Sequence, residues 1–293
     1  MADKQQWAGN TYGNGWMHKW LIRMLRYIDV RILYVFASVF VIPVCLVLNP
    51  SRKTAYHYFR NILGYGKWKA AWATYVNHCL FSQVVIDKFA MYAGKRFDVE
   101  TIGFEHYLER AQKEPGFMHL SSHVGNYEIA GYTLVSRNKI MNALVYAGEK
   151  ESVMENRNKM FEGTNTRMIA VKSDMSHLFE IDHALSNGEI VTMPADRKNG
   201  SAKEIRCEFF GKMASFPQGP FSVATMRGLD VLAVNVMKDG WTKYKIFITP
   251  IDYDRCAPRK EQMRQLSSAY VKELETRLRE YPTQWYNFFE FWT

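Results

Sequence analysis

His123-Val124-Gly125-Asn126-Tyr127-Glu128 places a base and a carboxylate where a strand turns into a helix. The apolar residues of 116–122 predict a short buried strand, and apolar positions recur at helical spacing over 129–135. Asn126 is a candidate N-cap, which puts Glu128 at the second helical position, where the helix dipole favours a negative charge. We therefore predict a strand–loop–helix corner of an α/β fold, with His123 in the loop.

His123 and Glu128 can act together only if the chain bends between them. Residues five apart on a continuous helix point about 140° away from each other, and Gly125 permits the bend. The pair would then be a dyad, in which the imidazole takes a proton from a hydroxyl and the carboxylate fixes the tautomer and stabilises the imidazolium. The alternative is a capped helix after a core strand, and a lone His-x4-Glu does not decide between the two.

Four further segments of the sequence favour the dyad over the capped helix. They are Met193-Pro194-Ala195-Asp196-Arg197, Cys207-Glu208-Phe209-Phe210-Gly211, Phe216-Pro217-Gln218-Gly219-Pro220 and Pro282-Thr283-Gln284-Trp285. In this order, after the His-x4-Glu stretch, they make the chain resemble the bacterial lipid A secondary acyltransferases of the lysophospholipid acyltransferase superfamily, over about residues 98–292. The resemblance implies transfer of a fatty acyl group from an acyl-carrier-protein or coenzyme A thioester to a lipid hydroxyl. It also implies that His123 is the general base and Glu128 its partner carboxylate.

The acceptor is less closely defined than the chemistry. In the family the Asp is commonly followed by Gln, whereas Arg197 and Lys198 follow Asp196 here. The N-terminal part resembles another branch of the superfamily, which includes members tied to aryl polyene or other specialised lipids. The resemblance implies a lipid A precursor as the first candidate acceptor, and these departures leave an aryl polyene-type lipid or a glycolipid as the alternative.

Periodicity predicts an α/β domain with a central, mostly parallel or mixed sheet flanked by helices. We expect a mixed sheet because residues 205–210 follow a strand without an intervening helix. Active sites in such sheets favour the carboxyl ends of strands, where His123 and Asp196 would both fall. The predicted strands are 97–102, 116–122, 140–146, 168–171, 190–194, 205–210, 231–237 and 244–250. The predicted helices are 51–64, 67–93, 103–113, 126–137, 151–162, 175–187, 218–228 and 259–280.

Charge is concentrated at one end of the 293-residue chain. Residues 1–70 hold ten Lys or Arg against two acidic residues, so they carry +8 of the net charge of +9. The same region contains seventeen consecutive uncharged residues, 32–48, near the lower limit of the roughly 17–25 that cross a bilayer. An apolar run with basic flanks indicates a membrane surface rather than nucleic acid. We predict a membrane-anchoring segment, 1–50, followed by an acyltransferase domain, 51–293.

Four scattered cysteines without metal-ligand spacing suit a reducing compartment. With the apolar segment, they predict an inner-membrane protein whose catalytic domain faces the cytoplasm. We expect no cofactor and no metal, because His119 and His123 share a strand face without a third ligand nearby.

Other candidate site residues surround the dyad. Asn126 is a candidate substrate contact within the motif. Asp196, Arg197 and Lys198 either bind the acceptor or the phosphate of the donor's phosphopantetheine, or form a charged turn. Gly219 begins a helix whose free N–H groups suit a phosphate or an oxyanion, or it is a plain helix start.

Two rival functions belong to other classes. A membrane-bound thioesterase or hydrolase would use the same dyad to activate water. A non-catalytic lipid- or nucleic-acid-binding protein would use the basic N-terminus, although the near-neutral remainder of the chain disfavours nucleic acid.

Overall fold

The computed structural model describes residues 15–136, 138–146, 148, 151–172, 174–197, 203–286, 288–289 and 291–292. The chain divides into two compact units. The helical unit comprises residues 1–97, 148–162 and 286–290, and the sheet unit comprises 98–147, 163–285 and 291–293. The predicted boundary at residue 50 stays a prediction.

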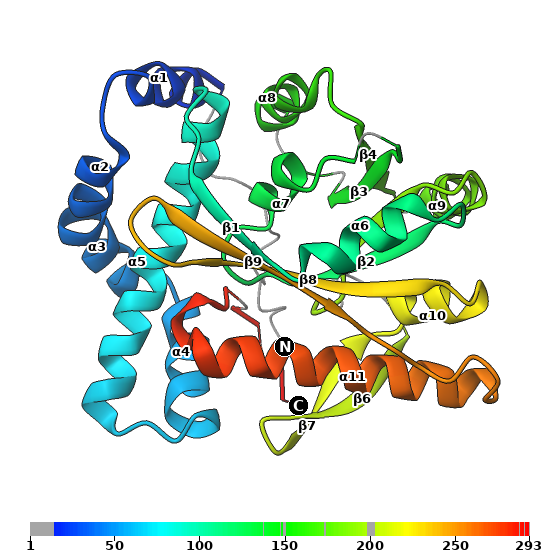
Figure 1. The fold of residues 1–293 in the computed structure, drawn as a ribbon. Coiled ribbons are helices and arrows are strands. Elements are labelled where there is room, and N and C mark those ends of the chain that lie inside the picture. Colours follow the sequence, from blue (N-terminus) through cyan, green and yellow to red (C-terminus); the bar gives the residue numbers. More distant parts are fainter. Residues whose placement is uncertain are drawn as a thin grey trace. The chain divides into compact units, whose positions relative to one another are not determined.

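The sheet unit is built on seven strands in the order β1-β9-β8-β2-β5-β3-β4 (Figure 1). The strands β8, β2, β5, β3 and β4 run parallel, whereas β9 is antiparallel to β8 and pairs β1 in parallel. The mixed sheet is as predicted. The bounds are Asp98–Ile102 for β1, Phe117–Ser121 for β2, Met141–Tyr146 for β3, Thr166–Val171 for β4, Ile190–Pro194 for β5, Asp230–Lys238 for β8 and Lys243–Pro250 for β9.

Helices connect and cover these strands. They are α6 (Phe104–Gln112), α7 (Glu128–Thr133), α9 (His177–Ser186), α10 (Gly219–Met226) and α11 (Arg259–Glu280), with a 3₁₀ turn η3 at Pro282–Gln284. Most predicted bounds are within two residues of these. The exception is α7, predicted over 126–137, which ends at Thr133; beyond it, the Ser136 hydroxyl accepts hydrogen bonds from the backbone N–H groups of Asn138 and Lys139. A side chain that bonds local backbone in this way competes with helical hydrogen bonds.

One expected reason for the mixed sheet was wrong. Residues 205–210 do not join the central sheet, because β6 (Glu204–Phe209) pairs with β7 (Lys212–Pro217) in a separate antiparallel hairpin. Phe210 and Gly211 join these strands at φ values of 52° and 72°. Two positive φ values are typical of the tight hairpin turn that matches strand twist. The antiparallel pair of the sheet is instead β8 and β9.

The core of the sheet unit lies around β2, whose five residues are all buried. A central strand covered on both faces is expected to be a continuous apolar run. On α11, the fully buried Tyr270 donates its hydroxyl to the carbonyl of Ser121, 2.9 Å away. This bond ties α11 to the carboxyl end of β2.

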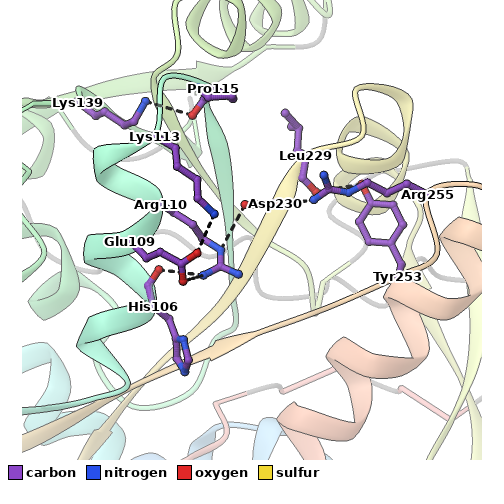
Figure 2. Close-up of polar contacts among 10 residues, drawn as sticks. All are labelled: His106, Glu109, Arg110, Lys113, Pro115, Lys139, Leu229, Asp230, Tyr253 and Arg255. Carbon is purple, nitrogen blue, oxygen red and sulfur yellow. Dashed lines mark hydrogen bonds and ion pairs between the residues drawn. The ribbon is translucent and has the colours of Figure 1, made fainter.

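Polar contacts fasten the opposite, amino-terminal ends of the strands (Figure 2). At the start of β8, Asp230 binds Arg110 of α6 and Arg255. Lys139 donates to the backbone carbonyls of Glu114, Pro115 and Gly188 at the starts of β2 and β5. These contacts hold the amino-terminal ends of the strands in place. The loops at the carboxyl ends of the same strands therefore start from fixed positions.

The helical unit contains eight helical segments among its described residues. They are α1 (Gly15–Leu25), α2 (Val30–Phe36), the π-helical η1 (Ala37–Val41), α3 (Ile42–Leu48), α4 (Ser51–His57), the π-helical η2 (Tyr58–Ile62), α5 (Lys67–Tyr92) and α8 (Glu151–Phe161). The segments α2, η1 and α3 form one continuous helix, Val30–Leu48, which is long and apolar enough to cross a membrane.

Candidate active site

His123 lies in the loop that follows β2, beside Asp196, which is the second residue after β5. Its backbone N–H donates to Asp196 Oδ2 at 2.9 Å, and its ring Nδ1 lies 2.7 Å from Asp196 Oδ1. The N–H of Ala195 donates to the carbonyl of Ser121, which continues the β2–β5 pairing to this point. Because β2 and β5 are parallel neighbours, their carboxyl ends meet at one edge of the sheet, as the sequence predicted for His123 and Asp196.

Asp196 is held by the protein on both carboxylate oxygens. The side chain is fully buried, and the indole Nε1 of Trp285 donates to Oδ2 at 3.3 Å. Trp285 is itself fixed, because it forms an antiparallel bridge with Val124 and the preceding carbonyl of Gln284 accepts from the N–H of Gly125. The carboxylate therefore has a single orientation relative to His123.

The charges of the pair determine the tautomer of His123. Burial disfavours ionisation of Asp196, but the charge and hydrogen bonds of His123, aided by Arg197, hold the pKa of Asp196 below its usual value. Burial lowers the pKa of His123, against the opposing effect of Asp196 and with a further lowering by Arg197. At neutral pH the pair is thus a carboxylate and a neutral imidazole. Since a carboxylate only accepts, Nδ1 carries the proton and Nε2 has the lone pair.

Gly125 gives the loop its bend, as predicted. Its φ is +49°, and a Cβ at this position would lie 1.8 Å from the carbonyl oxygen of Val236. The next residue, Asn126, donates its backbone N–H to that same oxygen at 3.0 Å. Only glycine fits where the loop crosses β8 this closely.

Glu128 is the first residue of α7 and is 7% exposed. The expected N-cap role of Asn126 was wrong, because the cap position is held by Tyr127, whose side chain makes no capping bond. The sequence assigned the carboxylate that orients the imidazole to Glu128, whereas the structure places Asp196 on Nδ1. Glu128 stays a predicted member of the site at the positive end of a short helix.

The other predicted residues are distributed as follows. Asn126 is 2% exposed, and its amide Nδ2 has no hydrogen-bond partner among the described residues. Arg197 is mostly buried beside Asp196, and burial lowers its pKa. Gly219 is the first residue of α10, as predicted, and α10 packs on α11 through Phe221 and Tyr270. Lys198 lies outside the described residues.

His119 and His123 are in different surroundings, although they are four residues apart. The His119 ring is buried between Tyr107 and Phe117, and burial lowers its pKa to about 3. Among the described residues, no group of three or more His, Cys, Asp or Glu is placed to hold a metal ion.

Sequence reasoning missed the parts that Asp196 and Trp285 play at His123. Both residues stand in the quoted segments, but Asp196 was expected to contact substrate or to form a charged turn, and Trp285 was given no role. The buried Trp285 ring packs on Phe209 and Phe291. One feature of the sequence could have indicated the contact between His123 and Asp196: both residues follow the ends of predicted strands.

A comparison with known protein families identifies the family of this chain. The model of the bacterial lipid A biosynthesis acyltransferase family matches residues 85–293, which is more than half of the chain. The chain belongs to this family. It is accordingly an acyltransferase that acts on a lipid, and the described site lies entirely within the matched residues.

Two further comparisons were made, with curated proteins and with solved structures. None of the curated proteins compared with this acyltransferase matches it. The crystal structure of the 1-acyl-sn-glycerophosphate acyltransferase PlsC from Thermotoga maritima is 18% identical, with a TM-score of 0.39, over 92% of this chain and 99% of that one.

Proposed function

We propose that this acyltransferase moves a fatty acyl group from a thioester, carried by acyl carrier protein or coenzyme A, to a hydroxyl group of a membrane lipid. A lipid A precursor is the first candidate acceptor, because the family is that of lipid A biosynthesis. An aryl polyene-type lipid or a glycolipid is the alternative, since Arg197 and Lys198 follow Asp196 here, whereas the family Asp is commonly followed by Gln.

The observation that carries the mechanism is the 2.7 Å contact between His123 Nδ1 and the buried carboxylate of Asp196. It leaves Nε2 as the nitrogen that removes the proton of the acceptor hydroxyl. The resulting alkoxide attacks the thioester carbonyl, and the tetrahedral intermediate collapses as the C–S bond breaks. The imidazolium returns its proton to the departing sulfur, so His123 ends the cycle neutral.

The remaining predicted residues have supporting roles in this proposal. Glu128 adds negative charge near the imidazolium, and Arg197 offers positive charge to the phosphate of the donor. The Nδ2 of Asn126, which has no hydrogen-bond partner among the described residues, and the first N–H groups of α10, from Gly219, are candidate donors to substrate oxygens. Lys198 is a further candidate cation.

We place the protein at the inner membrane with the catalytic residues on the cytoplasmic face. The support is the apolar helix Val30–Leu48, the basic residues around it and the lipid substrate of the family. Four cysteines without disulfide partners suit a reducing compartment. Acyl carrier protein and coenzyme A thioesters are both soluble donors that would approach from this side.

The proposal is tested by supplying purified protein with radiolabelled acyl thioester and a lipid extract. His123→Ala should lose acyl transfer by at least a hundredfold, whereas His183→Ala, which changes an exposed histidine of α9, should retain it. Near-normal transfer by His123→Ala would refute the mechanism. Release of free acid at the same rate with and without the lipid extract would instead identify a thioesterase.

A further inference from the structure

His123 lies in a bulge between the chain that continues β2 and its neighbour β8. At the near end of the bulge, the hydroxyl of Ser122 donates to the side-chain oxygen of Asn235 at 2.7 Å, so these two residues still face each other. Pairing resumes at a parallel bridge between Gly125 and Val236, the next residue of β8. His123 and the residue after it are therefore extra in the ladder. Bulges are frequent next to active sites, where they redirect a side chain.

The far end of the bulge is held from two sides. On one side, the backbone N–H of Asn126 donates to the carbonyl of Val236 on β8 at 3.0 Å. On the other side, the N–H of Gly125 donates to the carbonyl of Gln284, the last residue of η3, at 2.9 Å. The loop also forms an antiparallel bridge with Trp285. The position of the bulge thus depends on η3 as well as on β8.

The side chain of Gln284 joins η3 to the end of β8. Its Oε1 accepts from the backbone N–H of Lys238, and its Nε2 donates to the backbone carbonyl of the same residue, both at 2.7 Å. A primary amide has an acceptor and a donor side by side, and these match the N–H and C=O of one residue. Gln284 and Lys238 are both buried, so loss of either bond would remove a partner from a buried backbone group, which is costly.

Gln284 therefore connects the supports of both members of the catalytic pair. Its main-chain carbonyl holds the loop that carries His123, and the indole of the next residue, Trp285, donates to the carboxylate of Asp196. A shift of η3 would move the loop and the indole together. A misplacement of about 1 Å can cost on the order of a hundredfold in rate, even when it begins away from the reacting atoms.

We propose that Gln284 is a positioning residue for acyl transfer: by binding the backbone of Lys238, its amide keeps the bulge and Trp285 where they hold His123 against Asp196. This inference rests on the proposed function, in which His123 is the general base. It adds a residue from the other end of the catalytic domain, whose effect is on the chemical step and not on binding of the thioester.

Two substitutions in the full chain test the amide. Gln284→Glu keeps the size and the acceptor but cannot donate to the carbonyl of Lys238 when ionised, and Gln284→Met loses both bonds. Each should lower kcat by roughly ten- to a hundredfold and change KM for the thioester less than about twofold. The matched control is Gln262→Met, which removes two bonds that α11 donates to the carbonyls of Arg255 and Ala257 and should keep kcat within about twofold. An unchanged kcat in either Gln284 variant, with thermal unfolding showing that it is folded, would overturn the proposal.

A second background separates positioning from a general loss of structure. In His123→Ala the base is absent, so its position can no longer affect the rate. Adding Gln284→Met there should lower the residual rate of radiolabelled acyl transfer by less than about twofold, because the two changes act on one function. General damage would lower the rate by the same factor in both backgrounds, and equal factors would overturn the proposal. Near-normal transfer by His123→Ala alone would instead refute the proposed mechanism, whatever the Gln284 variants show.

Discussion

Asp196→Asn should disable His123 by reversing its tautomer. Two N–H donors converge on Oδ2, from the His123 backbone and from Trp285. The asparagine must therefore keep its oxygen there and turn its NH₂ group toward Nδ1 of His123, where Oδ1 had been. An NH₂ group can only donate, so Nδ1 must accept and the ring proton moves to Nε2. The nitrogen that faces the acceptor hydroxyl then has no lone pair.

The expected loss is large, because general base catalysis by a positioned side chain contributes about 10²–10⁴-fold and the wrong tautomer removes it. We expect kcat for acyl transfer to fall by about 10³–10⁴ while KM for the thioester changes little. The charge of Asp196 raises the pKa of His123, so its removal should lower that pKa. The acidic limb of the pH profile for the residual activity should therefore shift to lower pH.

The assay is steady-state acyl transfer between pH 5 and 8, with thermal unfolding to show that the variant is folded. Asp182→Asn is the matched control, because it removes one carboxylate charge from the exposed surface of α9, where Asp182 binds Arg227. A kcat for Asp196→Asn within threefold of the unchanged protein would refute the assignment of Asp196 as the orienting group.

Three further changes probe the same structure. Trp285→Phe removes one donor to the carboxylate and should lower kcat roughly tenfold, since a hydrogen bond to a charged group is worth about 1.5 kcal/mol or more; an unchanged kcat would contradict this. Gly125→Ala should lower the free energy of unfolding, measured in urea, by at least about 2 kcal/mol more than Gly211→Ala, which also has positive φ but open space around it. His119 has a pKa of about 3 when folded and about 6.5 when unfolded, so it stabilises the fold above pH 6.5 and progressively less as the pH falls toward 3. His119→Leu should therefore reduce the loss of unfolding free energy on acidification by up to about 1.4 kcal/mol per pH unit, and equal slopes for both proteins would refute the buried neutral imidazole.

Local pattern was sufficient for most elements of the sheet unit. The apolar runs of β2 and β5 and the long periodic stretch of α11 are set by residues close together in the chain, so their bounds followed from spacing. Gly211 is a residue typical of a turn, but the strand after it, β7, was not predicted. Its first residues, Lys212 and Met213, are exposed, so this strand has no continuous apolar run.

Strand order could not be derived in the same way. β2 and β5 are separated by α7, β3, α8, β4 and α9 in sequence, yet they are neighbours in the sheet. Their adjacency alone brings Asp196 to His123, 73 positions earlier in the chain. The sequence argument therefore chose the nearest carboxylate, Glu128, which needs only a local bend. Sheet neighbours are fixed by packing of the whole core, which spacing within a motif does not report.

The orienting carboxylate is better placed on a strand end than on the loop that carries the base. Taking a proton converts neutral His123 into an imidazolium in a largely buried site, where an isolated charge is costly. Asp196 is already ionised and buried there, held by Trp285 and by the backbone of His123. Proton transfer to the ring thus converts one buried anion into a neutral ion pair instead of creating a new isolated charge. Because Asp196 also binds the backbone of His123, and Trp285 bridges to Val124, the base and its counter-charge are held together as one unit.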